Sequence, residues 1–188
     1  GARFDIVYEY AHDHMLSPRV NIVWEPTETT TIKAGYSRYL VPPPFELIGA
    51  TDVALFANTS AAPAVPLGST VKAEHDDYFD VGASQIVLPG LKLGVDGYYK
   101  WATNLIDEGQ FGAPILLTPF NYRHGIVKGA ELSVTYDLDN WSLYGNFAAS
   151  KAMGKGIDSA QFNFQPDELA YIDSHSIPLA HDQTYTSS

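Results

Sequence analysis

The segment that decides the fold is residues 90–107, GLKLGVDGYYKWATNLID. Apolar and polar side chains alternate along its whole length. In an extended chain, one face would carry Leu91, Leu93, Val95, Tyr99 and Trp101, and the other would carry Lys92, Asp96, Lys100 and Asn104. Strands average about five or six residues in soluble domains. A strand of this length therefore needs a physical reason.

The length predicts a strand that crosses a membrane. About sixteen residues at about 3.3 Å each extend about 50 Å. Tilted by about 45°, such a strand rises about 37 Å, which exceeds a hydrocarbon core of about 30 Å. A soluble antiparallel sheet with one wet face shows the same alternation in any single strand. The length, rather than the alternation, carries the prediction.

The same period of two recurs along the chain and predicts an all-β antiparallel meander. Six further segments show it, at residues 3–11, 16–25, 29–39, 78–88, 124–137 and 141–151, and another strand begins within 181–188. No segment shows a helical period. We expect 16–25 to pair with 29–39, 78–88 with 91–106, and 124–137 with 141–151. The shared phase places one set of side chains toward lipid: Leu93, Val95, Tyr99, Ile126, Leu132, Val134, Leu143 and Phe147.

The connections alternate between short and long. Tight turns are predicted at EPTET (25–29), LPGL (88–91) and DLDN (137–140). Long loops are predicted at 41–73, 107–122 and 152–179, with HDHML (12–16) as a short connection on the same side. Short turns at one end and long loops at the other are typical of a transmembrane β-barrel of the outer membrane. The loop 41–73 contains Pro42, Pro43 and Pro44 and little charge, which favours a packed, ligand-facing loop over a linker.

Composition excludes several classes of function. The chain of 188 residues has 22 acidic residues against 11 Lys and Arg, a net charge of −11, so no nucleic-acid partner is expected. It contains no cysteine, which excludes disulfides and thiolate metal sites. No apolar run reaches the length of a transmembrane helix. The first residues already have strand character, so we expect the chain to be part of a larger protein.

Four segments resemble one family, in order and with matching spacing. They are LSPRVNIVWEPTETTTIKAGYSRYLVPPPFELI (16–48), DDYFDVGAS (76–84), LKLGVDGYYKWATNLID (91–107) and GIVKGAELSVTY (125–136). Together they resemble the barrel of TonB-dependent outer-membrane receptors. Asp80 stands where that family usually has Glu. The chain shows neither a plug domain nor a TonB box.

The resemblance implies the following. Residues 1–188 would form about seven or eight strands of a larger barrel, of about 22 strands in this family, located in the bacterial outer membrane. The receptor would take up a scarce nutrient (a ferric siderophore, cobalamin or a carbohydrate) with energy from TonB. Its partners would be outer-membrane lipid, its own plug, TonB through that plug, and the small-molecule ligand. The alternatives are a passive porin, an outer-membrane barrel enzyme and a soluble β-sandwich binding module.

Candidate site residues fall into two groups. Aromatic and basic side chains in the long loops are predicted to face a ligand: Phe45, Phe56, Phe111, Tyr122, Arg123, Phe162 and Phe164. Charged side chains on the polar side of the strands are predicted to face the lumen or a plug: Arg19, Lys33, Lys92, Asp96, Lys100 and Glu131. No catalytic, cofactor-binding or metal-binding residues are predicted, and we expect no enzyme activity. The HDH and EHDD motifs are interpreted as a solvated turn and a charged strand entrance.

Overall fold

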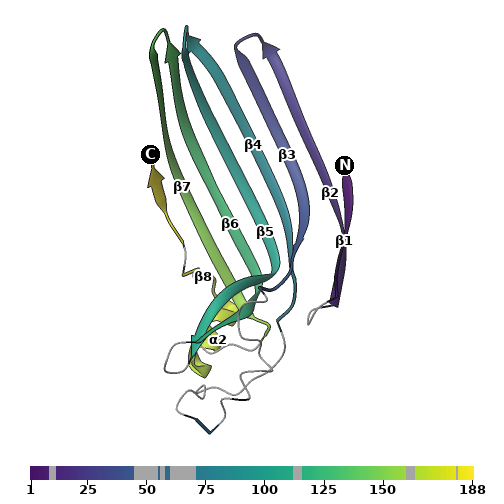
Figure 1. Ribbon diagram of the computed structural model, residues 1–188. Coiled ribbons are helices and arrows are strands. Elements are labelled where there is room, and N and C mark those ends of the chain that lie inside the picture. Colours follow the sequence, from purple (N-terminus) through teal and green to yellow (C-terminus); the bar gives the residue numbers. More distant parts are fainter. Residues whose placement is uncertain are drawn as a thin grey trace.

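A computed structural model of the protein describes residues 1–8, 12–44, 55, 58–59, 71–111, 116–159, 164–180 and 182–188. These residues form a single nine-stranded antiparallel sheet and one short helix (Figure 1). The strands follow one another in the order β1 to β8, and β9 also pairs with β7. Their bounds are β1 Ala2–Tyr8, β2 His12–Thr27, β3 Thr30–Val41, β4 Glu74–Leu88, β5 Leu91–Phe111, β6 Leu116–Leu138, β7 Trp141–Ile157, β8 Ile177–Pro178 and β9 Tyr185–Ser187, and the helix α2 is Pro166–Ser174.

The three predicted hairpins are confirmed. β2 pairs with β3, β4 with β5 and β6 with β7, all antiparallel. Their tight turns lie together at one end of the sheet, at the top of Figure 1. Gly90 has φ +78, and a Cβ at this position would contact the backbone carbonyl of Asp137 in the next hairpin. Glycine is thus required at this turn both for its backbone conformation and for space.

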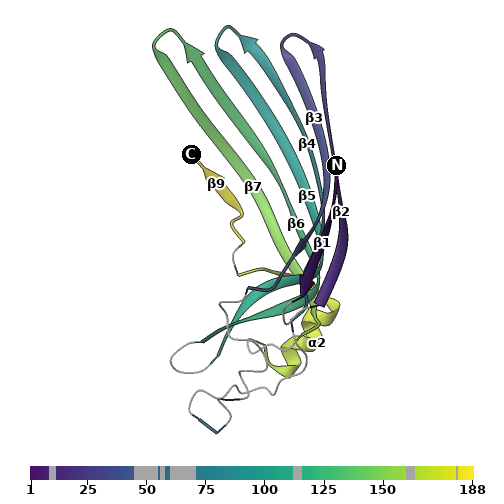
Figure 2. The ribbon, with the colours of Figure 1, turned by 45° about the vertical axis from the view of Figure 1, so that its right-hand side comes forward.

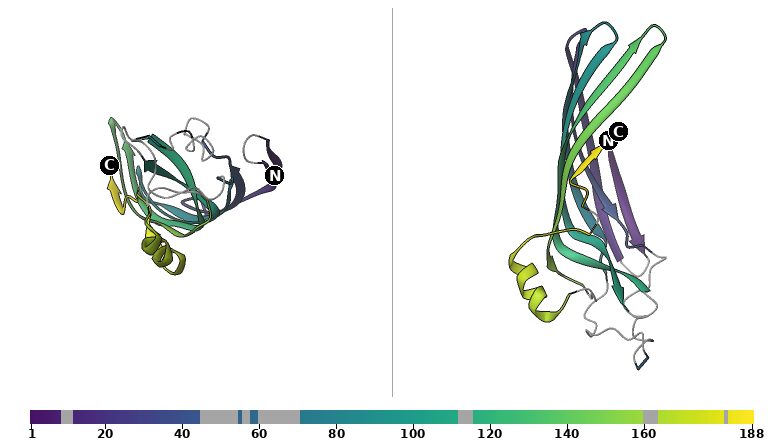
Figure 3. Two further views of the ribbon diagram at one scale, coloured as in Figure 1. Left: turned by 90° about the horizontal axis from the view of Figure 1, so that it is seen from below. Right: turned by 90° about the vertical axis from the view of Figure 1, so that its left-hand side faces the viewer.

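The sheet is curved and its described strands do not close into a ring (Figures 2 and 3). The strand register separates two faces. The apolar face is defined by rows such as Val95–Leu132–Phe147 and Ile22–Ala34–Val81, and the polar face by the row Lys33–Gly82–Asp96–Glu131. Away from the loop end, the apolar face is open: Leu132 and Leu143 are each 57% exposed. The predicted lipid-facing residues therefore share an open face, and their contact with lipid stays a prediction.

Burial is concentrated at the loop end, opposite the tight turns. One cluster consists of Ala102, Leu105, Phe120, Tyr122 and Ile172, and a smaller one of Met15, Leu40 and Ala73. β2 changes partner near this end, since residues 12–18 pair with β1 and residues 19–27 with β3. Between its two ends, the sheet thus exposes both of its faces. At the loop end, the two buried clusters hold the chain in place.

Three expectations about the connections were wrong. Residues 107–111 and 116–120 do not form a loop, because β5 and β6 continue as a hairpin with Asp107 opposite Phe120. The alternation is lost there because Asn104 has φ 56, which turns the following side chains. HDHML is not a turn either, since His12 and His14 lie in β2 opposite Tyr8 and Ile6.

The third error is α2, which lies within the predicted loop 152–179. Its sequence signal is short: Pro166 begins the helix, and Gln165 and Glu168 form a capping box. With only 9 residues, it shows too few turns for a helical period to be recognised. No helix in the described part of the chain is long and apolar enough to cross a membrane.

Candidate functional site

The polar face brings together the six residues predicted to face a lumen or plug. Arg19, Lys33, Lys92, Asp96, Lys100 and Glu131 all occupy its positions in the register. The Lys33 Nζ lies 2.7 Å from the Asp96 carboxylate, two strands away. Gly82 lies between them, and a Cβ there would collide with both side chains. The absence of a side chain at Gly82 therefore allows this ion pair to cross an intervening strand.

The remaining members of this group are more open. Lys92 lines a shallow concavity together with Lys33, Asp96 and Ser133. Glu131 accepts a hydrogen bond from the Asn146 side chain at 3.2 Å. These groups lie on the face that a plug would meet in a plugged barrel, and their contact with a plug stays a prediction.

Lys100 is the exception, because carboxylates of its own wall surround it. Its Nζ lies 2.7 Å from Glu74 and 3.3 Å from Asp76, whose side chains are 6% and 0% exposed. Glu74 also accepts a hydrogen bond from the backbone N–H of Ile106 at 2.7 Å. One carboxylate oxygen of Asp76 is buried with no hydrogen-bond partner among the described residues. The EHDD motif is therefore part of a mostly buried cluster with two acids for one base.

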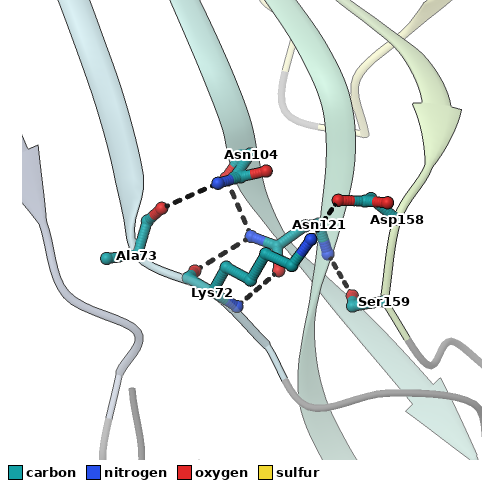
Figure 4. A network of polar contacts seen from close by, with 6 residues as sticks. All are labelled: Lys72, Ala73, Asn104, Asn121, Asp158 and Ser159. Carbon is teal, nitrogen blue, oxygen red and sulfur yellow. Dashed lines mark hydrogen bonds and ion pairs between the residues drawn. The ribbon is translucent and has the colours of Figure 1, made fainter. Parts of the chain in front are cut away.

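Asn121 forms the centre of a polar network at the loop end (Figure 4). Its side chain, fully buried, accepts a hydrogen bond from the N–H of Lys72 at 2.7 Å. It donates to the carbonyls of Lys72 and Asn104, at 3.1 Å and 2.8 Å. The N–H of Asn121 donates to Ser159 Oγ at 2.7 Å, and Lys72 Nζ lies 2.5 Å from Asp158. This network joins the end of the segment 41–73 to β5, to β6 and to the chain that follows β7.

An aromatic cluster lies beside this network. The rings of Phe120 and Tyr122 are 5.1 Å apart, and Phe164 lies 6.1 Å from Phe120. Tyr122 is only 2% exposed and belongs to the same buried cluster as Ile172 of α2. The structure thus shows Tyr122 and Phe164 packing the segment after β7 against the sheet. Their predicted contact with a ligand stays a prediction.

Arg123 connects the sheet to α2. Its guanidinium lies 3.0 Å from the carboxylate of Asp173. Gly156 of β7 has φ +64, and a Cβ there would lie 3.2 Å from the Arg123 guanidinium carbon. Glycine at this position leaves room for the arginine side chain. The ion pair is half exposed, so its contribution to stability is small.

Phe45, Phe56 and Phe162 lie outside the described residues, as does the side chain of Phe111. Of the predicted loop 41–73, only residues 41–44, 55, 58–59 and 71–73 are described. In the described part of the chain, no three His, Asp or Glu side chains are grouped so that they could hold a metal ion. Sequence reasoning missed Asn121 and Lys72, because no spacing marks residues whose partners are 49 positions away.

Comparison with known proteins agrees with this geometry. The family model described as TonB dependent receptor-like, beta-barrel, matches residues 1–185. Neither the curated proteins nor the solved structures gave a match. The matched range covers almost all of the chain, including every strand of the meander. The chain belongs to the TonB-dependent receptor β-barrel family, whose members are receptors and transporters of the outer membrane.

Proposed function

We propose that this chain is one segment of the barrel wall of a receptor that takes up a scarce small-molecule nutrient with energy from TonB. The observation that carries the proposal is the register of β2 to β7. It places apolar side chains on one face and charged side chains on the other, along strands of up to 23 residues. The tight turns of the β2–β3, β4–β5 and β6–β7 hairpins lie at one end, as in barrels whose long loops face outward from the cell.

The rest of the wall would come from further strands of the same receptor. Strand edges exposed to lipid leave backbone groups without hydrogen bonds, so a membrane-spanning sheet must close. The described strands are not closed, which supports their being part of a larger barrel around a plug. Lys92, Asp96 and Glu131 then face that plug, and TonB acts through the plug rather than on this segment.

The loop end supplies the recognition surface. The Asn121 network and the aromatic cluster hold the ends of the segments 41–73 and 158–176 against β5 and β6. A rigid base of this kind positions recognition loops. The nutrient classes that fit the family are a ferric siderophore, cobalamin or a carbohydrate.

The test is uptake by the complete receptor, with residues 50–68 deleted. Both flanking strands keep their register, so the deletion variant should insert and run as a heat-modifiable barrel on a gel. Uptake of the nutrient should fall at least tenfold. Normal uptake by this variant would show that the segment has no role in recognition.

Cells without TonB separate active transport from the porin alternative. Active uptake requires TonB, so the wild-type receptor should bind its nutrient in these cells but not import it. Import that continues at the wild-type rate without TonB would identify a passive channel.

A further inference from the structure

We propose that the apolar face of β4 to β7 binds a phosphate-bearing lipid of the outer leaflet, with its phosphate at Lys128 and Lys151. The proposal rests on the proposed function for the orientation of the barrel in the membrane. It concerns the outside of the wall, which neither the plug nor the nutrient reaches.

The first observation is a pair of like charges in register. Lys128 lies directly opposite Lys151 on the apolar face, and four residues closer to the loops His124 lies opposite Lys155. Like charges directly opposite each other in a sheet are destabilising. Neither Lys128 nor Lys151 forms an ion pair with any residue in the described part of the chain. An anion from outside the chain would therefore neutralise this pair of charges.

The strand positions around these lysines carry no carboxylate, and the Asp182 carboxylate at the edge of β7 accepts a hydrogen bond from the backbone N–H of Ala152 at 2.9 Å. From the tight turn to His124, the apolar-face positions of β6 and β7 carry no Asp or Glu, although acidic residues outnumber basic ones by 22 to 11. By contrast, Arg38 lies on the same face over β3, and Asp77 of β4 faces it at 3.7 Å. One positive charge of this face is thus neutralised within the sheet, while the lysine pair is not.

The second observation is the height of the pair above the turns. Lys128 is ten residue steps from Leu138, the last residue of β6. At about 3.3 Å per residue and a tilt of about 45°, these steps rise about 23 Å. The apolar band of such barrels is about 25 Å tall, so the lysines lie at its border on the loop side. Tyr99 is beside Lys128 in the register, as expected of an aromatic side chain at a membrane interface.

The third observation is a shallow groove of about 500 Å³ next to Lys128. It is lined by Phe79 and Val81 of β4, Gly97 and Tyr99 of β5, and Lys128 itself. The row of Gly97 continues through Ala130 and Ala149, two residues closer to the tight turns than the lysines. The groove thus extends from the positive charges toward the centre of the membrane. An acyl chain attached to a phosphate head group has this arrangement of charge and apolar surface.

The test measures lipid retention by the complete receptor in detergent, using native mass spectrometry. The probe is bisphosphorylated lipid A, compared with its dephosphorylated form. The double variant Lys128→Gln/Lys151→Gln should bind the bisphosphorylated probe at least tenfold more weakly, which equals about 1.4 kcal/mol. The matched control, Lys33→Gln/Lys92→Gln, removes the same charge from the polar face and should bind like the wild type. Heat-modifiable mobility on a gel checks that both variants are folded.

A further variant, Gly97→Val, narrows the groove; a Cβ at this position would have only the carbonyl of Gly129 nearby, at 3.8 Å. It should weaken retention of both probes. Three results would overturn the proposal: equal binding by the lysine variant and the wild type, no preference for the phosphorylated probe, or a lipid-free dimer held through this face. The lipid measurement needs no nutrient, so a failed uptake assay would not contradict the lipid proposal. Likewise, a lack of lipid binding would not contradict the proposal of nutrient uptake.

Discussion

Substitution of Leu132 by arginine tests the membrane placement of the apolar face. Leu132 is six residue steps from Leu138 at the tight turn. These steps rise about 14 Å, close to the middle of an apolar band about 25 Å tall. An arginine on the lipid face at the midplane costs about 2–4 kcal/mol, and near the interfaces about 0–1 kcal/mol. We therefore expect Leu132→Arg to lower the free energy of unfolding by about 2–4 kcal/mol.

Leu143 provides a matched control. Like Leu132, it lies on the apolar face and is 57% exposed, but it is two residue steps from Trp141 at the turn. Its height is therefore about 5 Å, and Leu143→Arg should cost about 0–1 kcal/mol. The assay is urea unfolding of the complete receptor in phosphocholine vesicles, followed by tryptophan fluorescence. Equal losses for the two variants would show that depth in a bilayer does not determine the cost, and the placement of this face would be wrong.

Two further substitutions test the loop end and the tight turns. Asn121→Ala removes three buried side-chain hydrogen bonds, two to Lys72 and one to Asn104, so the free energy of unfolding should fall by about 3–6 kcal/mol. The control Asn21→Ala, on the exposed polar face, should change the free energy of unfolding by no more than about 0.5 kcal/mol. Protease cleavage within 41–73 should accelerate in the Asn121 variant only, and unchanged cleavage would contradict the role of the network. Gly90→Ala should cost at least about 1–2 kcal/mol because of its left-handed backbone and its contact with Asp137; urea unfolding with wild-type stability would refute that reasoning.

The hairpins were predictable from sequence because their signals are local. Alternation of side chains along 78–88 and 91–107 defines two faces without knowledge of any partner, and Pro89-Gly90 defines the reversal between them. The register then follows from the turn. The same local reasoning ended the strand at residue 106, shortly after the left-handed residue Asn104, although β5 continued to Phe111.

The tertiary structure alone decided how distant residues meet. Asn121 contacts Lys72, 49 positions away, and Lys100 contacts Glu74, 26 positions away, and no periodicity in the sequence connects them. Lys128 and Lys151 are ordinary exposed lysines in the sequence, and only the pairing of β6 with β7 makes them direct neighbours. Side-chain periodicity is a property of each strand, so the sequence by itself determined the meander and its two faces. The contacts of the loop end depend on register across several strands, which exists only once the sheet has formed.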